Sequence, residues 1–294
     1  MPELKAYQEF LQSKGHAVAL YRDSAGVPHN AEVVWWMCGH VLSVIQHRLP
    51  NAFHVHEYAS ASTPPMARAK DTLKRWTQAQ PDHRVFQSPW VRSRMAFTDN
   101  CPYDYRDMGI DALFFDAVGK PKATEFDFVY LGEMHRLNRF IHTLEALETT
   151  GRTLLLVGEV PATLAKRLRY FRNIHYAGRV EHTRVPAQLR RASVGLNLVP
   201  DLAPYRHQTS TKLLEYCAVG LSVASTDYAW ARHFAERTGA SFYWLPQETD
   251  TGQWTNAFGA TLDNHHFVTP CVGSLMWDRQ IGEMAVWRRF LQLP

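Results

Sequence analysis

The residues whose types and spacing could best bind a ligand lie close together in the sequence: Thr209, Ser210, Thr211, Lys212 and Glu215. The hydroxyl of Thr209 or Ser210 can cap a helix that starts here. The free amides of residues 210–212 and the positive end of the helix dipole would then converge with the Lys212 ammonium, a combination that favours a phosphate or diphosphate. Glu215, one turn further in, can accept hydrogen bonds from sugar hydroxyls. An ordinary helix–strand unit without a ligand is the alternative interpretation of this stretch.

The elements around this junction follow from hydrophobic periodicity. Leu213, Leu214 and Cys217 form a helical apolar stripe, and Gly220 stands where a left-handed residue ends a helix. Residues 221–226 are small or apolar, which is typical of a parallel strand covered on both faces. Strands are also predicted at 127–131, 153–157, 174–177, 194–199 and 242–245, with helices between them that include 137–147, 162–171, 230–237 and 253–262. This alternation predicts a parallel, Rossmann-like sheet.

Further candidate ligand-binding residues lie in the turns and loops that follow these strands. The turn from Gly132 to Arg136 is a strand-to-helix turn of the kind that receives phosphates, and Arg136 and Arg139 would supply permanent positive charge. The loop of residues 200–208 carries Tyr205, Arg206 and His207 between a central strand and the Glu215 helix, so it should line the ligand-binding side. A surface turn with solvated arginines is the alternative for residues 132–139.

The first part of the chain predicts a second α/β domain. A helix at 4–14 leads to a short strand candidate at 17–21, and further strands are expected at 31–37, 52–57 and 85–88. His40, His54, His56 and Glu57 lie at or near the carboxyl ends of these strands, where α/β sheets collect ligands. A metal site there is disfavoured, because alternate strand residues would need further ligands from elsewhere.

Residues 67–76 predict a basic helix with Arg68, Lys70, Lys74 and Arg75. Such runs are usually solvated faces, but a phosphate-bearing acceptor, an anionic bilayer or a nucleic acid could also dock there. The last part, 277–291, has the pattern of one amphipathic helix.

Composition is that of a globular protein with 294 residues, 46% apolar residues and a net charge of +4, which suits an anionic nucleotide or an anionic membrane surface. The four cysteines form no Cys-x-x-Cys pair, so neither a zinc knuckle nor a disulfide framework is indicated. The first residues do not resemble a signal peptide, and no apolar run approaches about 18 residues. We therefore expect a cytoplasmic protein that can lie peripheral to the inner face of a membrane.

Residues 127–227 resemble the donor-binding half of retaining nucleotide-sugar glycosyltransferases of the GT-B fold, close to glycosyltransferase family 4. The resemblance implies an α/β protein with two Rossmann-like domains facing a cleft, the N-terminal one shortened because the family's first strand is absent. It implies an acceptor-side domain at 1–120, a donor domain at 121–276, and a C-terminal helix at 277–294 that crosses back to the first domain. The linker is expected at 118–122.

The resemblance also implies roles for particular residues. Relatives carry a Glu-x7-Glu signature whose second Glu holds the donor ribose; Glu215 matches this position, and His207 replaces the first Glu, without a fixed negative charge. Glu133 replaces the usual Arg after Gly132, so Arg136 and Arg139 would take over diphosphate binding, and residues 178–180 would bracket the base. The implied catalytic residues are His56, near the donor sugar, His207 and Lys212. The implied donor-binding residues are Gly132, Arg136, Arg139, Gly158, Arg179, Val180, Tyr205, Thr209, Ser210, Thr211, Lys212, Leu214 and Glu215.

The implied activity is transfer of a sugar from a UDP- or GDP-sugar to a hydroxyl of a glycan, lipid-linked, protein or nucleic-acid acceptor, with retention and without a metal or other cofactor. Two alternatives are a nucleotide-sugar 2-epimerase, which would need more acidic groups, and a non-catalytic module that binds a nucleotide sugar or a partner protein.

Overall fold

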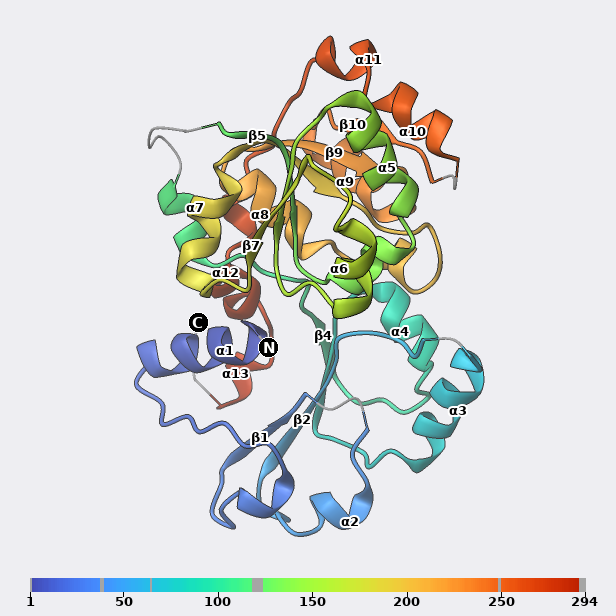
Figure 1. Ribbon diagram of the computed structural model, residues 1–294. Coiled ribbons are helices and arrows are strands. Elements are labelled where there is room, and N and C mark those ends of the chain that lie inside the picture. Colours follow the sequence, from blue (N-terminus) through green and yellow to red (C-terminus); the bar gives the residue numbers. More distant parts are fainter. Residues whose placement is uncertain (1, 38–39, 64, 118–123, 248–249, 291–294) are drawn as a thin grey trace. The chain divides into compact units, whose positions relative to one another are not determined.

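The structure is a computed structural model that describes residues 2–37, 40–63, 65–117, 124–247 and 250–290 (Figure 1). The chain divides into two compact units, Met1–Gly109 with Leu275–Pro294, and Ile110–Ser274. The predicted linker at 118–122 falls outside the described residues.

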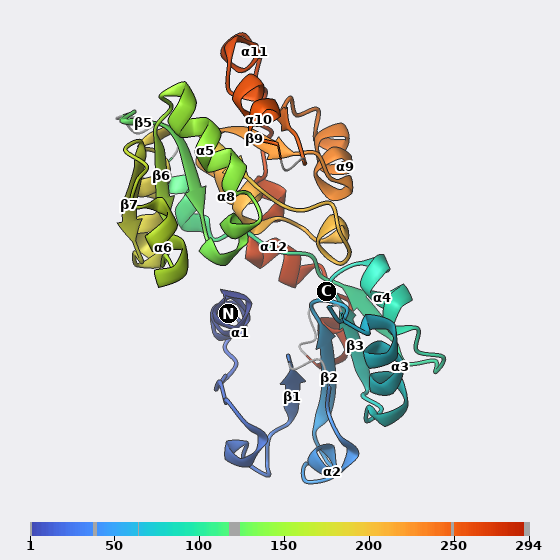
Figure 2. The ribbon, with the colours of Figure 1, turned by 45° about the vertical axis from the view of Figure 1, so that its right-hand side comes forward.

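The first unit contains a parallel sheet whose strands lie in chain order, β1-β2-β3-β4. The strands are β1 (Val33–Trp36), β2 (Phe53–Tyr58), β3 (His83–Phe86) and β4 (Tyr103–Tyr105). The helices are α1 (Pro2–Ser13), α2 (Ser43–Gln46), α3 (Ala67–Thr77), α4 (Pro89–Met95), α12 (Trp277–Gly282) and α13 (Trp287–Phe290), with a 3-10 turn at Ser24–Gly26. Within this unit, α1 lies on one side of the sheet and α3 and α4 on the other (Figures 1 and 2).

Two expectations for this unit are wrong. Residues 17–21 form no strand, and the short strand β4 was not predicted. The single helix expected at 277–291 is instead the two helices α12 and α13. The reason for the break is the Asp104 carboxylate, which accepts hydrogen bonds from the backbone amides of Ala285 (3.0 Å) and Val286 (2.8 Å) and so holds them away from helical partners.

The core of the first unit joins its earliest and latest residues. Trp287 stacks on Trp35 with ring centroids 5.2 Å apart, and the Tyr7 ring is 4.8 Å from that of Trp35. Beneath them Glu57 and Arg106 form a buried ion pair, and Trp35 Nε1 donates to Glu57 at 2.7 Å. The residues after 275 are therefore part of this core.

The second unit contains a six-stranded parallel sheet of order β10-β9-β8-β5-β6-β7. Its strands are β5 (Phe126–Leu131), β6 (Leu154–Val157), β7 (Ile174–Gly178), β8 (Ala192–Asn197), β9 (Ser222–Thr226) and β10 (Tyr243–Leu245). Its helices are α5 (Ile141–Thr150), α6 (Ala162–Leu168), α7 (Val185–Leu189), α8 (Thr211–Ala218), α9 (Ala229–Thr238), α10 (Thr251–Ala257) and α11 (Ala260–Asp263). The 3-10 turns are Ala112–Ala117, Met134–Asn138, His182–Arg184, Tyr205–His207 and Gly273–Leu275.

Helices cover both faces of this sheet, with α7 and α8 on one face and α5 and α6 on the other (Figure 1). The predicted alternation of strands and helices is therefore present, with two differences. A 3-10 turn at Met134–Asn138 precedes α5 in place of the helix start at 137, and the helix expected at 253–262 is interrupted at Gly259. Among the described residues, no helix is long and apolar enough to cross a membrane.

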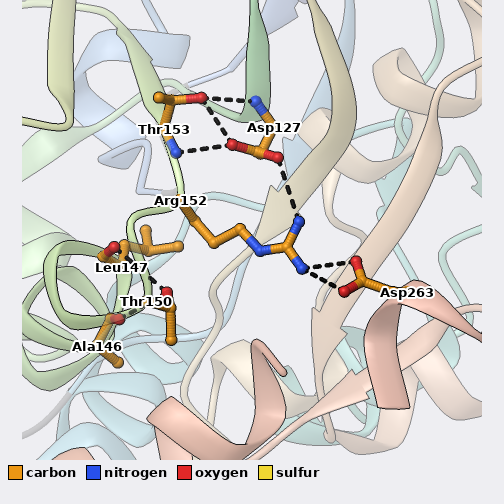
Figure 3. A network of polar contacts seen from close by, with 7 residues as sticks. All are labelled: Asp127, Ala146, Leu147, Thr150, Arg152, Thr153 and Asp263. Atoms are coloured by element: carbon orange, nitrogen blue, oxygen red, sulfur yellow. Dashed lines mark hydrogen bonds and ion pairs between the residues drawn. The ribbon is translucent and has the colours of Figure 1, made fainter. Parts of the chain in front are cut away.

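A polar network stabilises the amino ends of β5 and β6 (Figure 3). Asp127 accepts hydrogen bonds from Thr153 N and Oγ1, both at 2.8 Å, and pairs with Arg152 at 3.3 Å. Arg152 also binds both carboxylate oxygens of Asp263 at 2.6 Å. This network lies at the amino ends of the strands, and the groups predicted to bind a ligand lie at the carboxyl ends.

Candidate functional site

The candidate site lies at the carboxyl ends of β5 and β8, where the strand order of the second unit reverses. After β5 the chain builds β6 and β7 on one side, then returns to build β8, β9 and β10 on the other. In open α/β sheets such a switch point is where the carboxyl ends of neighbouring strands part and ligands bind.

Tyr216, on α8, fills the space where the two strands part. The last paired residues of β5 and β8 are Val129 and Gly195. Beyond them Leu131 N donates to the Tyr216 hydroxyl at 2.9 Å, and that hydroxyl donates to Leu196 O at 3.2 Å. A Cβ on Gly195 would lie 2.4 Å from the Tyr216 ring, so only glycine allows this approach. Tyr216 thereby sets the position of α8 against the parted strands.

The first turn of α8 places Lys212 beside these strand ends. Its Nζ lies 3.8 Å from the centroid of the Tyr130 ring, and a Cβ on Gly132 would lie 3.9 Å from Nζ. This Nζ is buried and has no hydrogen-bond partner among the described residues. Burial, and after it the positive charge of Arg136, holds the pKa of Lys212 well below its ordinary value, while Glu215 and Glu133 oppose the shift.

The start of α8 is anchored by a buried polar cluster. Ser210 is the residue before the helix, but its hydroxyl donates to Asn197 Oδ1 at 2.6 Å and makes no cap, so the expected capping by Ser210 is wrong. Asn197 Nδ2 in turn donates to Ser225 Oγ at 2.9 Å and to the Tyr228 hydroxyl at 3.4 Å. The first amides of α8 have no acceptor within the helix, and the side chain of Ser210 does not accept from them. Gly220 ends the helix with φ of 74°, as the sequence predicts.

Glu215 lies one turn after Lys212. Burial raises the pKa of Glu215 to about 8; Lys212 opposes this shift and Asp111 adds to it. Asp111 Oδ2 also lies 3.2 Å from His182 Nε2. Asp111 therefore connects the surroundings of Glu215 with the turn after β7, where residues 178–180 were expected to hold a base.

Two turns that contain glycine follow the carboxyl ends of β5 and β6. Gly132 has φ of 107° and Gly158 has φ of 150°, both in the region that favours glycine. A Cβ on Gly158 would lie 2.5 Å from the carbonyl oxygen of Gly132, so the two turns are in contact. Gly158 N donates to Gly178 O at 2.9 Å, which brings the turn after β7 alongside them.

The remaining predicted donor-binding residues differ in exposure. The Arg136 guanidinium lies 5.3 Å from the centroid of the Tyr205 ring, so the structure brings this cation and the 200–208 loop together. Arg139 and Arg179 are exposed, and Thr209, Thr211 and Val180 are half-buried. Leu214 is buried. His207 is half-buried, and burial followed by Arg206 lowers its pKa.

His56 lies in the first unit, on β2, and is buried. Its Nδ1 is 2.7 Å from Gln78 Nε2. Burial, followed by the charges of Arg84 and His54, lowers the pKa of His56 to about 3, so the imidazole is neutral at physiological pH. Among the residues that the structure describes, no three His, Cys, Asp or Glu side chains gather as a metal-binding group.

Four residues of this site were missed from the sequence: Asp111, Tyr130, Asn197 and Tyr216. Asn197 could have been recognised from the sequence, because a side-chain amide inside the apolar run Val194–Val199 must have buried hydrogen-bond partners. Tyr216 could not have been recognised, since an aromatic residue on a helix that faces a sheet is usually a core residue.

No protein-family model matches the sequence, and no curated protein matches it. Solved structures do. The structure of Anabaena Alr3699/HepE in complex with UDP-glucose aligns with a TM-score of 0.59 at 10% identity, over 89% of this chain and 75% of HepE. WaaG, a glycosyltransferase involved in lipopolysaccharide biosynthesis, aligns with a TM-score of 0.56 at 15% identity, over 80% of this chain and 70% of WaaG.

AviGT4, a glycosyltransferase involved in avilamycin A biosynthesis, aligns with a TM-score of 0.55 at 13% identity, over 90% of this chain and 76% of AviGT4. At such identities a likeness establishes architecture. The chain thus has the α/β fold of the GT-B glycosyltransferases, with two Rossmann-like parallel sheets.

Proposed function

We propose that this protein is a glycosyltransferase that moves a sugar from a UDP- or GDP-sugar to an acceptor hydroxyl. The observation that carries the proposal is the buried Lys212 ammonium, which has no hydrogen-bond partner among the described residues and lies at the start of a helix at the switch point. A buried cation without a partner is costly unless an anion joins it. Arg136 and the dipole of α8 add to the same positive field.

The proposed chemistry uses this field on the leaving group. As the bond from the sugar to the diphosphate breaks, negative charge grows on the phosphate oxygens, and preorganised cations and amides stabilise the transition state more than the ground state. Lys212, Arg136 and the first amides of α8 supply these groups, with Arg139 as a further cation near the same turn. In this proposal the reaction retains the anomeric configuration, needs no metal, and passes the acceptor proton to the departing phosphate.

The nucleoside end of the donor would lie toward Glu215. With its raised pKa, Glu215 can accept a hydrogen bond from a ribose hydroxyl as a carboxylate or donate one as an acid. The backbone at 178–180, beside Gly158 and near the Asp111–His182 pair, would hold the base. HepE was solved with UDP and with UDP-glucose, which supports a uridine donor as the first to test. His207 and Tyr205 would face the sugar, and we propose His56 as the contribution of the first unit.

The proposal predicts that the protein binds a free nucleoside diphosphate. We expect UDP or GDP to raise the melting temperature, because a ligand at about 100 times its dissociation constant adds about 2.7 kcal/mol to the stability of the folded state. The measurement is a thermal-shift titration with each nucleotide, confirmed by calorimetry, with adenosine as the control. If neither nucleotide binds, the donor site does not exist. If the protein instead converts a nucleotide sugar to its 2-epimer, the proposed activity is epimerisation and not sugar transfer.

We also infer that α3 contacts an anionic membrane surface. Met66, Leu73 and Trp76 are 74%, 60% and 79% exposed on or beside this helix, which carries Arg68, Lys70, Lys74 and Arg75. An exposed Trp among cations suits the boundary between anionic headgroups and acyl chains.

Sedimentation with vesicles tests this contact. We expect binding to phosphatidylcholine vesicles that contain phosphatidylglycerol and none to phosphatidylcholine alone. Lys74→Gln should weaken binding about fivefold, because one basic residue near an anionic surface contributes about 1 kcal/mol. Tyr170→Ala, which removes a residue 71% exposed in the other unit, is the control. Equal binding to both kinds of vesicle would contradict the inference.

A further inference from the structure

The second unit has a hollow that the predicted site does not use. Its volume is about 810 Å³, and it lies at the carboxyl ends of β9 and β10 and the start of α9. The residues that determine its chemistry are Asp201, Arg206, Asp227, Arg232, Trp244 and Gln247. We call it the β9–β10 groove. None of the proposed donor-binding residues lines this groove. Asp201 and Arg206 belong to the 200–208 loop, which was expected to line the ligand-binding side.

The charges of the β9–β10 groove cancel in pairs. Arg206 pairs with Asp201 at 3.1 Å, and Arg232 binds both carboxylate oxygens of Asp227, at 2.7 and 2.5 Å. The Lys212 site, by contrast, concentrates positive charge. A hollow with balanced charges does not attract an anion or a cation from a distance, so it favours a neutral ligand.

The polar groups of the groove are held in place and not saturated. Gln247 Nε2 donates to Val199 O and Asp227 O, both at 3.0 Å, and its Oε1 accepts from Asp201 N at 3.3 Å. Asp201 Oδ1 and Arg206 Nε are buried and have no hydrogen-bond partner among the described residues. The exposed parts of this ion pair, in which the side chains of Arg206 and Asp201 are 43% and 33% exposed, can donate to and accept from a ligand that does both, as a hydroxyl does.

The groove also has an aromatic surface. The Arg232 guanidinium lies 3.9 Å from the centroid of the Trp244 ring, so a planar cation covers part of the ring while its edge groups bind Asp227. The Arg232 guanidinium has further N–H donors beyond the two that bind Asp227, so it can also donate to a sugar hydroxyl, and an aromatic side chain packs against C–H groups.

We propose that the β9–β10 groove is a second carbohydrate-binding site, which takes a neutral oligosaccharide. The proposal goes beyond sugar transfer, because binding there needs neither the donor nor Lys212. Hydroxyl pairs would bind the Arg206–Asp201 and Arg232–Asp227 pairs, and one sugar face would pack on the exposed part of Trp244.

Calorimetry and tryptophan fluorescence with a panel of neutral tetrasaccharides (maltotetraose, cellotetraose, tetra-N-acetylchitotetraose and mannotetraose) test the proposal. We expect at least one to bind, and Arg232→Ala, at a solvent-accessible position that should not impair folding, to weaken it at least tenfold. Trp244→Ala should do the same, with circular dichroism to confirm folding. Trp76→Ala, which removes an exposed tryptophan of the first unit, is the matched control and should bind normally.

The outcomes separate this site from the donor site. If UDP binds but no tetrasaccharide does, the groove proposal is overturned and the donor proposal stands. Oligosaccharide binding that survives Arg232→Ala and Trp244→Ala also overturns it, as does tighter binding of an anionic tetrasaccharide such as a heparin fragment. If tetrasaccharides bind with the predicted losses while UDP does not, only the donor proposal fails.

Discussion

Replacing Lys212 with alanine should reduce sugar transfer by about two to three orders of magnitude, which is the effect of removing one preorganised group that stabilises developing negative charge. The fold should be retained, because the ammonium is buried without a hydrogen-bond partner among the described residues, and its removal ends a desolvation that the Tyr130 ring and Glu215 offset only in part. We therefore expect an unchanged or higher melting temperature beside the lost activity. Turnover with radiolabelled UDP-glucose and thermal unfolding measure the two effects.

The depressed pKa of Lys212 adds a second readout to the same experiment. A diphosphate favours the ammonium form, so binding raises this pKa, and at a pH above the depressed value the protein takes up a proton as UDP binds. UDP affinity should consequently fall as pH rises. Calorimetry in two buffers of different ionisation enthalpy measures the uptake, and the Lys212→Ala variant should lose it. Lys166→Ala, on α6, is the control, and normal turnover by Lys212→Ala would remove this residue from the site.

Replacing Arg106 with methionine should destabilise the first unit by about 3–5 kcal/mol, because it leaves a buried carboxylate without its counter-charge. Among the residues that the structure describes, Glu57 would keep only the hydrogen bond from Trp35 Nε1. The change also removes a guanidinium 5.2 Å from the Trp277 ring and 5.7 Å from the Tyr7 ring, so it loosens the contact between the beginning and the end of the chain. Urea unfolding followed by tryptophan fluorescence measures the loss.

A double variant distinguishes charge from packing in this prediction. Glu57→Gln combined with Arg106→Met removes both charges and should recover much of the stability, since a neutral replacement of a buried pair is often tolerated. Arg184→Met breaks the exposed pair with Glu181 and should cost less than about 1 kcal/mol. A double variant no more stable than Arg106→Met alone would show that packing, not charge, dominates at this position.

The second unit could be predicted well because its signals are local. The strands from Phe126 to Leu245 are short and consist mainly of apolar or small residues, and Gly220 marks the end of α8 correctly. The turn at Gly132 and the helix start at Lys212 were each predicted as phosphate-binding, and they lie beside each other in the structure because parallel strands present their carboxyl ends together.

The errors arise where distant residues override a local pattern. The hydroxyl of Ser210 could cap α8 by sequence, but Asn197 on a neighbouring strand binds it more closely. The periodicity of 277–291 indicates one helix, yet Asp104 captures two of its amides. The two ion pairs of the β9–β10 groove are each local in the sequence, but the groove itself was missed, because only the completed sheet brings both pairs together with Trp244 and Gln247.

The stacking of Trp287 on Trp35 has a consequence for how the chain folds during its synthesis. Ribosomes add about 5–20 residues per second, and domains form as their residues emerge. Residues 110–274 contain every strand of their own sheet, so they can complete their core while later codons are still being read. The residues of the first unit that precede this segment must wait for Trp277 and Trp287, which are translated after residues 110–274, before their hydrophobic surface is covered. The nascent amino-terminal segment is therefore the part of this protein that most needs chaperone protection.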